Sequence, residues 1–146
     1  MNQASIFIPF IGMMLLTMAV WLYMYTLRLT FLRREKIDPQ LASTTRQMLD
    51  IVPTRVNLPS ENLINLFELP VLFYALCIYL YVTGQVDATY LVLAYGFFVF
   101  RVLHSVIHCT YNRVLHRFYA YSISSLALWV MIVMAFFTLI QSVVKY

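Results

Sequence analysis

The sequence predicts an all-α integral membrane protein, with residues 1–146 forming a single four-helix transmembrane domain. Hydrophobic residues make up 62% of the chain and charged residues 11%, whereas soluble domains average about a quarter charged residues. Four apolar stretches each provide the roughly 20 residues that a membrane-spanning helix needs. Glycine is scarce, with 3 residues, which favours long helices over a membrane β-barrel with its frequent turns and alternating polarity.

The four predicted spans cover residues 6–32, 61–82, 89–111 and 118–144. Pro9 falls in the first turns of the first span, where a missing backbone N–H matters little. Pro70 lies inside the second span, so we expect a kink there. The N-terminus has no basic region before its apolar run and no small-residue cleavage site, and the first stretch is therefore interpreted as a retained span rather than a signal peptide.

Basic residues gather in two of the three connections between spans. These residues are Arg33, Arg34, Lys36, Arg46 and Arg55 before the second span, and Arg113 and Arg117 before the fourth. The connection TGQVDA between the second and third spans has none. The positive-inside rule then places the basic connections in the cytoplasm and both termini on the non-cytoplasmic side. The net charge of +4 is explained by this topology and by contact with anionic membrane lipids, so no nucleic-acid partner is expected.

Polar residues recur on one face of two spans. On the second span Glu61, Asn65 and Glu68 are separated by four and three residues, which places them on one side of a helix. A second polar stripe consists of Arg101, His104, His108 and Tyr111, and is continued by Arg113, Arg117 and Tyr121. A charge at the centre of the bilayer costs at least about 2.5 kcal/mol, so such residues pair or line a wet cavity. Helix rise places Glu68 about 10 Å and Arg101 about 18 Å from the cytoplasmic ends of their spans, and we expect the two charges to meet inside the bundle.

The polar residues leave more than one interpretation open. A buried Glu68–Arg101 pair is equally compatible with a packing lock that performs no chemistry. His104 and His108 are four residues apart and could bind a metal with Glu68. The chain has only 3 histidines and no HExxH motif, so no metal site is predicted.

Two segments resemble a known family. The segment NLFELPVLF, residues 65–73, resembles the signature on the second helix of the MAPEG family, the membrane-associated proteins in eicosanoid and glutathione metabolism. The segment FRVLHSVIHCTYNRVLHRFYAYSIS, residues 100–124, resembles the third helix and the start of the fourth in the same family. The resemblance covers essentially the whole chain. It implies a homotrimer that binds glutathione between neighbouring subunits near the cytoplasmic side and acts on a lipophilic small-molecule substrate. The absence of targeting signals and of a C-terminal retrieval motif favours a bacterial inner membrane.

The resemblance also implies roles for individual residues. Arg117 matches the catalytic arginine that stabilises the glutathione thiolate in family enzymes. The residues implied in glutathione binding are Arg28, Asn65, Glu68, Arg101, His104, His108 and Tyr121. These roles are chemically reasonable because a cysteine thiol has a pKa of about 8.5 and must lose its proton to attack. A guanidinium within about 4 Å favours the charged thiolate.

Two positions depart from the family pattern. Glu61 stands where enzymatic members carry an arginine, and Ile64 stands where a second basic residue is common. Those cations meet the carboxylates of glutathione, so an acidic residue should weaken binding unless Arg46 or Arg55 folds back to replace them. Two hypotheses therefore remain: a glutathione-dependent transferase or peroxidase that uses Arg117, and a non-catalytic trimeric membrane protein that binds lipid or a protein partner.

By analogy with the family that the sequence resembles, we predict a homotrimer with the second span near the threefold axis. This assembly would also bury the polar faces of the second and third spans, which are too polar to face lipid. Mass measurement in mild detergent should give three copies of the chain. A stable monomer or dimer at every protein concentration would contradict this assembly.

Overall fold

The computed structural model describes residues 2–42 and 44–144, and these residues form helices and short connections without any β-strand. Four helical segments are long and apolar enough to cross a membrane: Gln3–Arg34, Thr54–Val82, Ala88–Cys109 and Val114–Val144. The predicted all-α fold with four membrane-spanning helices is thus confirmed.

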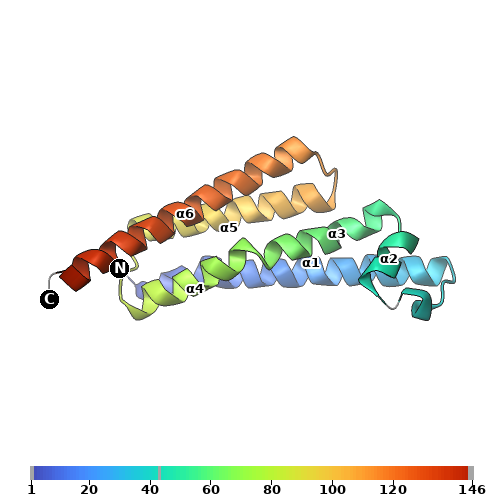
Figure 1. Ribbon diagram of the computed structural model, residues 1–146, viewed down its shortest axis with the longest axis horizontal. Helices are drawn as coiled ribbons and strands as arrows, with labels where there is room; N and C mark the ends of the chain where they lie inside the picture. Colours follow the sequence, from blue (N-terminus) through green and yellow to red (C-terminus); the bar gives the residue numbers. More distant parts are fainter. Residues whose placement is uncertain (1, 43, 145–146) are drawn as a thin grey trace.

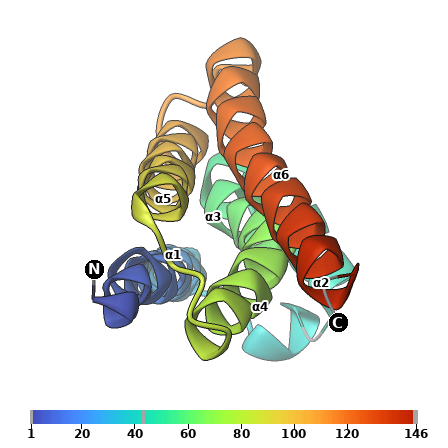
Figure 2. The same cartoon turned by 90° about the vertical axis from the view of Figure 1, so that its left-hand side faces the viewer.

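The helices pack lengthwise into an elongated bundle (Figures 1 and 2). The long helices are α1 (Phe7–Arg34), α3 (Thr54–Leu66), α4 (Leu69–Val82), α5 (Ala88–Cys109) and α6 (Val114–Val144). The short ones are η1 (Gln3–Ile6), η2 (Pro39–Ala42) and α2 (Thr45–Ile51). In Figure 1, α1 begins, α6 ends and α4 turns into α5 at one end, here called the terminal end. The opposite end, here called the loop end, holds the α1–α3 connection and the α5–α6 turn.

The second span is broken into two helices. Helix α3 ends at Leu66, Phe67 and Glu68 have non-helical backbone angles, and α4 starts at Leu69. Pro70 explains why the break lies directly after Leu66. A proline inside a helix clashes with the carbonyl group four residues earlier, which here is that of Leu66. The expected irregularity therefore lies at residues 67–68, before Pro70 rather than at it.

The connection predicted as a long loop is largely helical. Helix α2 begins with a capping box, in which the Thr44 side chain accepts from the Gln47 backbone and the Gln47 side chain accepts from the Thr44 backbone. Helix α3 already begins at Thr54, and Asn57 donates to the Val52 carbonyl at 3.3 Å. Helix α6 begins at Val114, so Arg117 lies on a helix rather than in a turn.

The core lies between the helices in the half nearer the terminal end. Phe73 of α4 stacks on Phe97 of α5 with ring centroids 4.5 Å apart, and both rings are fully buried. Helix α1 approaches closely at Gly12, where an added Cβ would lie 2.8 Å from a ring atom of Phe98. The terminal end is tied together by Gln3, whose amide group donates to the Val86 carbonyl at 3.1 Å and accepts from the Val86 N–H at 2.8 Å.

We predict that Phe73→Ala lowers the free energy of unfolding by about 3–5 kcal/mol, since it removes a buried ring and leaves a cavity. The measurement is denaturant or thermal unfolding in detergent. Phe137→Ala is the matched control, because this ring is 59% exposed on the outer surface, and its effect should be small. Equal effects of the two substitutions would contradict the placement of the core.

Candidate functional site

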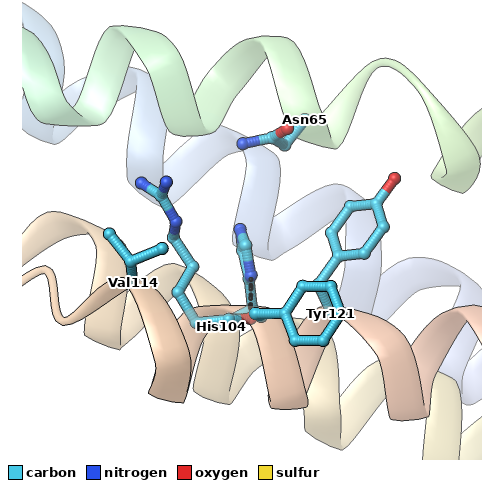
Figure 3. A pocket seen from close by; sticks show the side chains of 6 residues that line it. Asn65, His104, Val114 and Tyr121 are labelled. Atoms are coloured by element: carbon cyan, nitrogen blue, oxygen red, sulfur yellow. Dashed lines mark hydrogen bonds between the residues drawn. The ribbon is translucent and has the colours of Figure 1, made fainter.

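Polar side chains from α3, α5 and α6 surround a pocket in the half of the bundle nearer the loop end. The pocket has a volume of about 240 Å³. Its lining consists of Asn65, His104, Val114, Arg117, Phe118 and Tyr121. Figure 3 shows His104 pointing across the space toward Asn65, with Val114 and Tyr121 on the neighbouring helix. We call this space the first pocket.

Arg117 is held by two hydrogen bonds from a single nitrogen. Its Nη1 donates to His108 Nε2 at 2.8 Å and to Asn112 Oδ1 at 2.9 Å. An arginine carries five N–H donors, two of them on each Nη and one on Nε. The two hydrogens of Nη1 are therefore both used, while Nε and Nη2 make no hydrogen bond to the described residues. A half-buried guanidinium on the pocket wall is well suited to bind an anion.

His108 links Arg117 to α3. Because Nε2 accepts from Arg117, the neutral ring must carry its proton on Nδ1. Glu61 Oε2 lies 3.6 Å from the same Nε2, and the Glu61 side chain is 52% exposed. This distance exceeds that of a normal hydrogen bond. The same imidazole nitrogen thus contacts a cation from α6 and lies near a carboxylate from α3.

His104 is oriented by the backbone of α6. Its Nδ1 lies 3.1 Å from the carbonyl oxygen of Arg117, which can only accept, so Nδ1 carries the proton. The other nitrogen, Nε2, is buried without a hydrogen-bond partner among the described residues. The ring also contacts Tyr121, with centroids 5.6 Å apart. A buried acceptor without a donor marks a place where a ligand N–H or O–H would be stabilised.

Arg101 is fully buried behind the first pocket. Its guanidinium lies 4.5 Å from the ring centroid of Tyr121 and 5.4 Å from that of Phe97. Its Nη1 makes a long hydrogen bond of 3.5 Å to the carbonyl of Asn65. The charge is therefore stabilised by two aromatic faces and a backbone carbonyl, while Nε and Nη2 have no partner in the described chain.

A second pocket of about 510 Å³ lies between α1 and the α3–α4 break. It is lined by Met24, Arg28, Ser60, Leu63, Ile64, Phe67 and Glu68. Glu68 is exposed and lines this pocket at the non-helical break between α3 and α4. The second pocket thus holds one carboxylate and one guanidinium, and the Nε and Nη2 atoms of Arg28 are buried without partners.

Comparison with known proteins agrees with this arrangement of four apolar helices and a polar site. A sequence model of the MAPEG family matches residues 6–137. The chain belongs to the MAPEG family. No curated protein and no solved structure matches it. Together with the four apolar helices, membership identifies an integral, multi-pass membrane protein.

In this MAPEG protein the residues implied by the sequence fall into two groups. The first pocket gathers Asn65, His104, Arg117 and Tyr121, with Arg101 and His108 directly beside it. The second pocket gathers Arg28 and Glu68. Glu68 and Arg101 do not form the expected ion pair within 4 Å in the described chain. Glu68 lines the second pocket and acts on Arg101 only as a more distant charge, while Arg101 contacts Phe97, Tyr121 and Asn65.

Two residues, Asn62 and Asn112, support the site without having been predicted for it. Asn62 is fully buried, accepts from the Ser105 hydroxyl at 3.4 Å and donates to Cys109 Sγ at 3.6 Å. Asn112 lies in the α5–α6 turn and accepts from Arg117. Asn62 lies three residues before Asn65, and this spacing on one helix face was an available signal. The contact between Asn112 and Arg117 could not be predicted in the same way, because it depends on the conformation of the α5–α6 turn.

The MAPEG protein's described residues contain no group of three or more His, Cys, Asp or Glu side chains that could hold a metal ion. The two histidines that suggested a metal site are engaged otherwise. His104 faces a backbone carbonyl and His108 accepts from Arg117. Glu68, the third suggested ligand, lines the second pocket.

Double-mutant cycles should separate the real partner of Arg101 from the expected one. We predict that Arg101→Leu and Tyr121→Leu couple by about 0.5–2 kcal/mol in unfolding free energy, the range for a desolvated cation–π contact. Arg101→Leu and Glu68→Gln should couple more weakly, since no ion pair within 4 Å joins these side chains among the described residues. Stronger coupling with Glu68 than with Tyr121, measured by unfolding in detergent, would overturn this assignment.

Proposed function

We propose that this MAPEG protein is a glutathione-dependent transferase or peroxidase that acts on lipophilic electrophiles. In this proposal the tripeptide occupies the first pocket, and Arg117 stabilises its thiolate. The observation that carries the proposal is the state of Arg117, a guanidinium on the pocket wall whose Nη1 is fixed and whose Nε and Nη2 donors are unused.

The chemistry follows from this geometry. A thiol ionises more readily when a guanidinium lies within about 4 Å, and the effect increases where water is excluded. The apolar side chains of Val114 and Phe118 lie on the rim of the pocket and are exposed on the surface of the bundle. A lipophilic electrophile could reach the sulfur from the bilayer between helices, and the tripeptide could enter from the aqueous side at the loop end.

The division of polar residues between two pockets supports an assembly with shared sites. Within one chain, Arg28 and Glu68 line a different pocket from Arg117. We propose a homotrimer in which the second pocket of one subunit faces the first pocket of its neighbour. Glu68 would then accept from the amino group of glutathione, and Arg28 would meet a carboxylate. The proposed orientation has the loop end in the cytoplasm and both termini outside, in a bacterial inner membrane.

A second function is favoured by one observation. Glu61 places an exposed carboxylate one helical turn from Asn65, beside the first pocket, where it repels the carboxylates of glutathione. The alternative is a non-catalytic trimeric membrane protein that binds lipid or a protein partner.

We predict that Arg117→Ala abolishes the ultraviolet absorption band of bound thiolate while leaving the assembly mass unchanged. Arg113→Ala is the matched control, because Arg113 is an exposed arginine directly before α6, and it should retain the band. Retention of the band in Arg117→Ala would exclude Arg117 as the stabilising charge.

Glu61→Arg should strengthen glutathione binding about threefold or more, because it replaces repulsion of the tripeptide's carboxylates with attraction. Titration calorimetry of the detergent-solubilised protein measures the change. The enzymatic function is excluded if the unaltered protein shows neither binding nor a thiolate band at millimolar glutathione and Glu61→Arg restores neither.

A further inference from the structure

We propose that Asn112 and His108 are positioning residues that clamp Nη1 of Arg117 and so present its Nε–Nη2 edge to the first pocket as an anion-binding fork. The effect of the clamp on a thiol rests on the function proposed above. The clamp itself is a property of the ligand-free protein and can be tested without glutathione.

The clamp uses both hydrogens of one nitrogen. Nη1 of Arg117 donates to His108 Nε2 at 2.8 Å and to Asn112 Oδ1 at 2.9 Å. Hydrogen bonds from a charged donor are stronger than neutral ones. Two acceptors on one nitrogen of a planar group fix both the position of the guanidinium and the direction of its plane. An unclamped arginine has several rotatable bonds and would lose more conformational entropy on binding an anion.

Asn112 owes its position to the α5–α6 turn. Its φ angle is 47°, in the left-handed region that asparagine tolerates better than most residues. Its backbone N–H donates to the Ile107 carbonyl at 2.8 Å, which closes the end of α5. The turn therefore fixes the side-chain oxygen Oδ1 of Asn112 beside the first turn of α6, which carries Arg117.

His108 supplies the second acceptor from the adjacent helix. The imidazole is nearly fully buried and packs edge-on against His104, with centroids 5.6 Å apart and planes at 90°. Its Nε2 lone pair must be free to accept from Arg117. Glu61 lies 3.6 Å from this nitrogen, too far for a hydrogen bond of normal length that would compete.

The remaining edge of the guanidinium is the part that recognises a ligand. Nε and Nη2 form the side-on fork that suits a carboxylate or another compact anion. Among the described residues no carboxylate lies within ion-pair distance of Arg117. The clamp thus fixes the orientation of the cation without neutralising it, since both clamp acceptors are uncharged.

The first experiment measures how fast phenylglyoxal modifies Arg117 in the ligand-free protein, at constant pH in detergent, by mass spectrometry of peptides. Asn112→Gly removes the acceptor and tolerates the positive φ angle, so Arg117 should react about threefold faster or more, because a charge-assisted hydrogen bond has been lost. Asn112→Asp keeps an acceptor and should react no faster than the unaltered protein. Exposed Arg113 is the internal control and should react equally in all variants. An unchanged Arg117 rate in Asn112→Gly would overturn the clamp.

A second pair of variants tests the other acceptor. His108→Gln retains a carbonyl oxygen that can accept from Arg117, whereas His108→Leu does not. The Leu variant should accelerate modification of Arg117 and the Gln variant should restore a rate closer to that of the unaltered protein. If Gln and Leu behave alike while both variants keep the native assembly mass and unfolding temperature, His108 is not a positioning residue.

The final experiment links the clamp to the thiol. In Asn112→Gly the pH midpoint of thiolate formation by bound glutathione should rise by about 0.5–1 unit, which is about threefold to tenfold less thiolate at low pH. An unchanged midpoint would overturn the role in positioning. If the modification rates change as expected but the unaltered protein forms no thiolate, the clamp stands and the proposed function fails.

Discussion

A fully buried guanidinium with no carboxylate within ion-pair distance among the described residues is the constraint around which the loop-end half of this protein is organised. Arg101 must be stabilised where water is absent, and it is stabilised by the faces of Phe97 and Tyr121 and by the carbonyl of Asn65. That carbonyl is available to Arg101 because the helix breaks at residues 67–68, so no backbone N–H of α4 donates a helical hydrogen bond to it. The aromatic partner on α6 also borders the first pocket. The buried charge therefore connects the broken span, α5 and α6 in one arrangement.

The fold class could be predicted from sequence because apolar length alone identifies helices that cross a bilayer. The start of α3 at Thr54 could not, since its first turns are polar and contain Pro59. The clash between Pro70 and the Leu66 carbonyl could have placed the end of α3. Helical periodicity could not predict the placement of Glu68. Phe67 and Glu68 have non-helical backbone angles, so α4 does not continue the turn of α3. The helix face that Glu61, Asn65 and Glu68 were expected to share is therefore lost.

The site was predictable to the extent that its residues repeat on helix faces. His104 and His108 follow Arg101 on α5 at helical spacing, and the structure places all three near the first pocket. Their specific partners were not predictable. The hydrogen bonds of His104 and His108 depend on how far α6 is rotated against α5, and the contact of Asn112 with Arg117 depends on a left-handed residue in the α5–α6 turn. Periodicity describes one helix and says little about the angle between two.

The break in the second span also determines where the boundary between the hydrocarbon layer and the aqueous phase crosses the molecule. Helix α4 has 14 residues and is about 21 Å long, which is shorter than the roughly 30 Å hydrocarbon layer. The remaining length corresponds to about six residues, which are the two residues of the break and about four residues at the end of α3, so this depth reaches back to the neighbourhood of Leu63. The boundary then passes beside the first pocket, close to Glu61. A molecule bound there would have one end among lipid tails and the other in water, so this pocket suits amphiphilic ligands better than ligands that are uniformly polar or apolar.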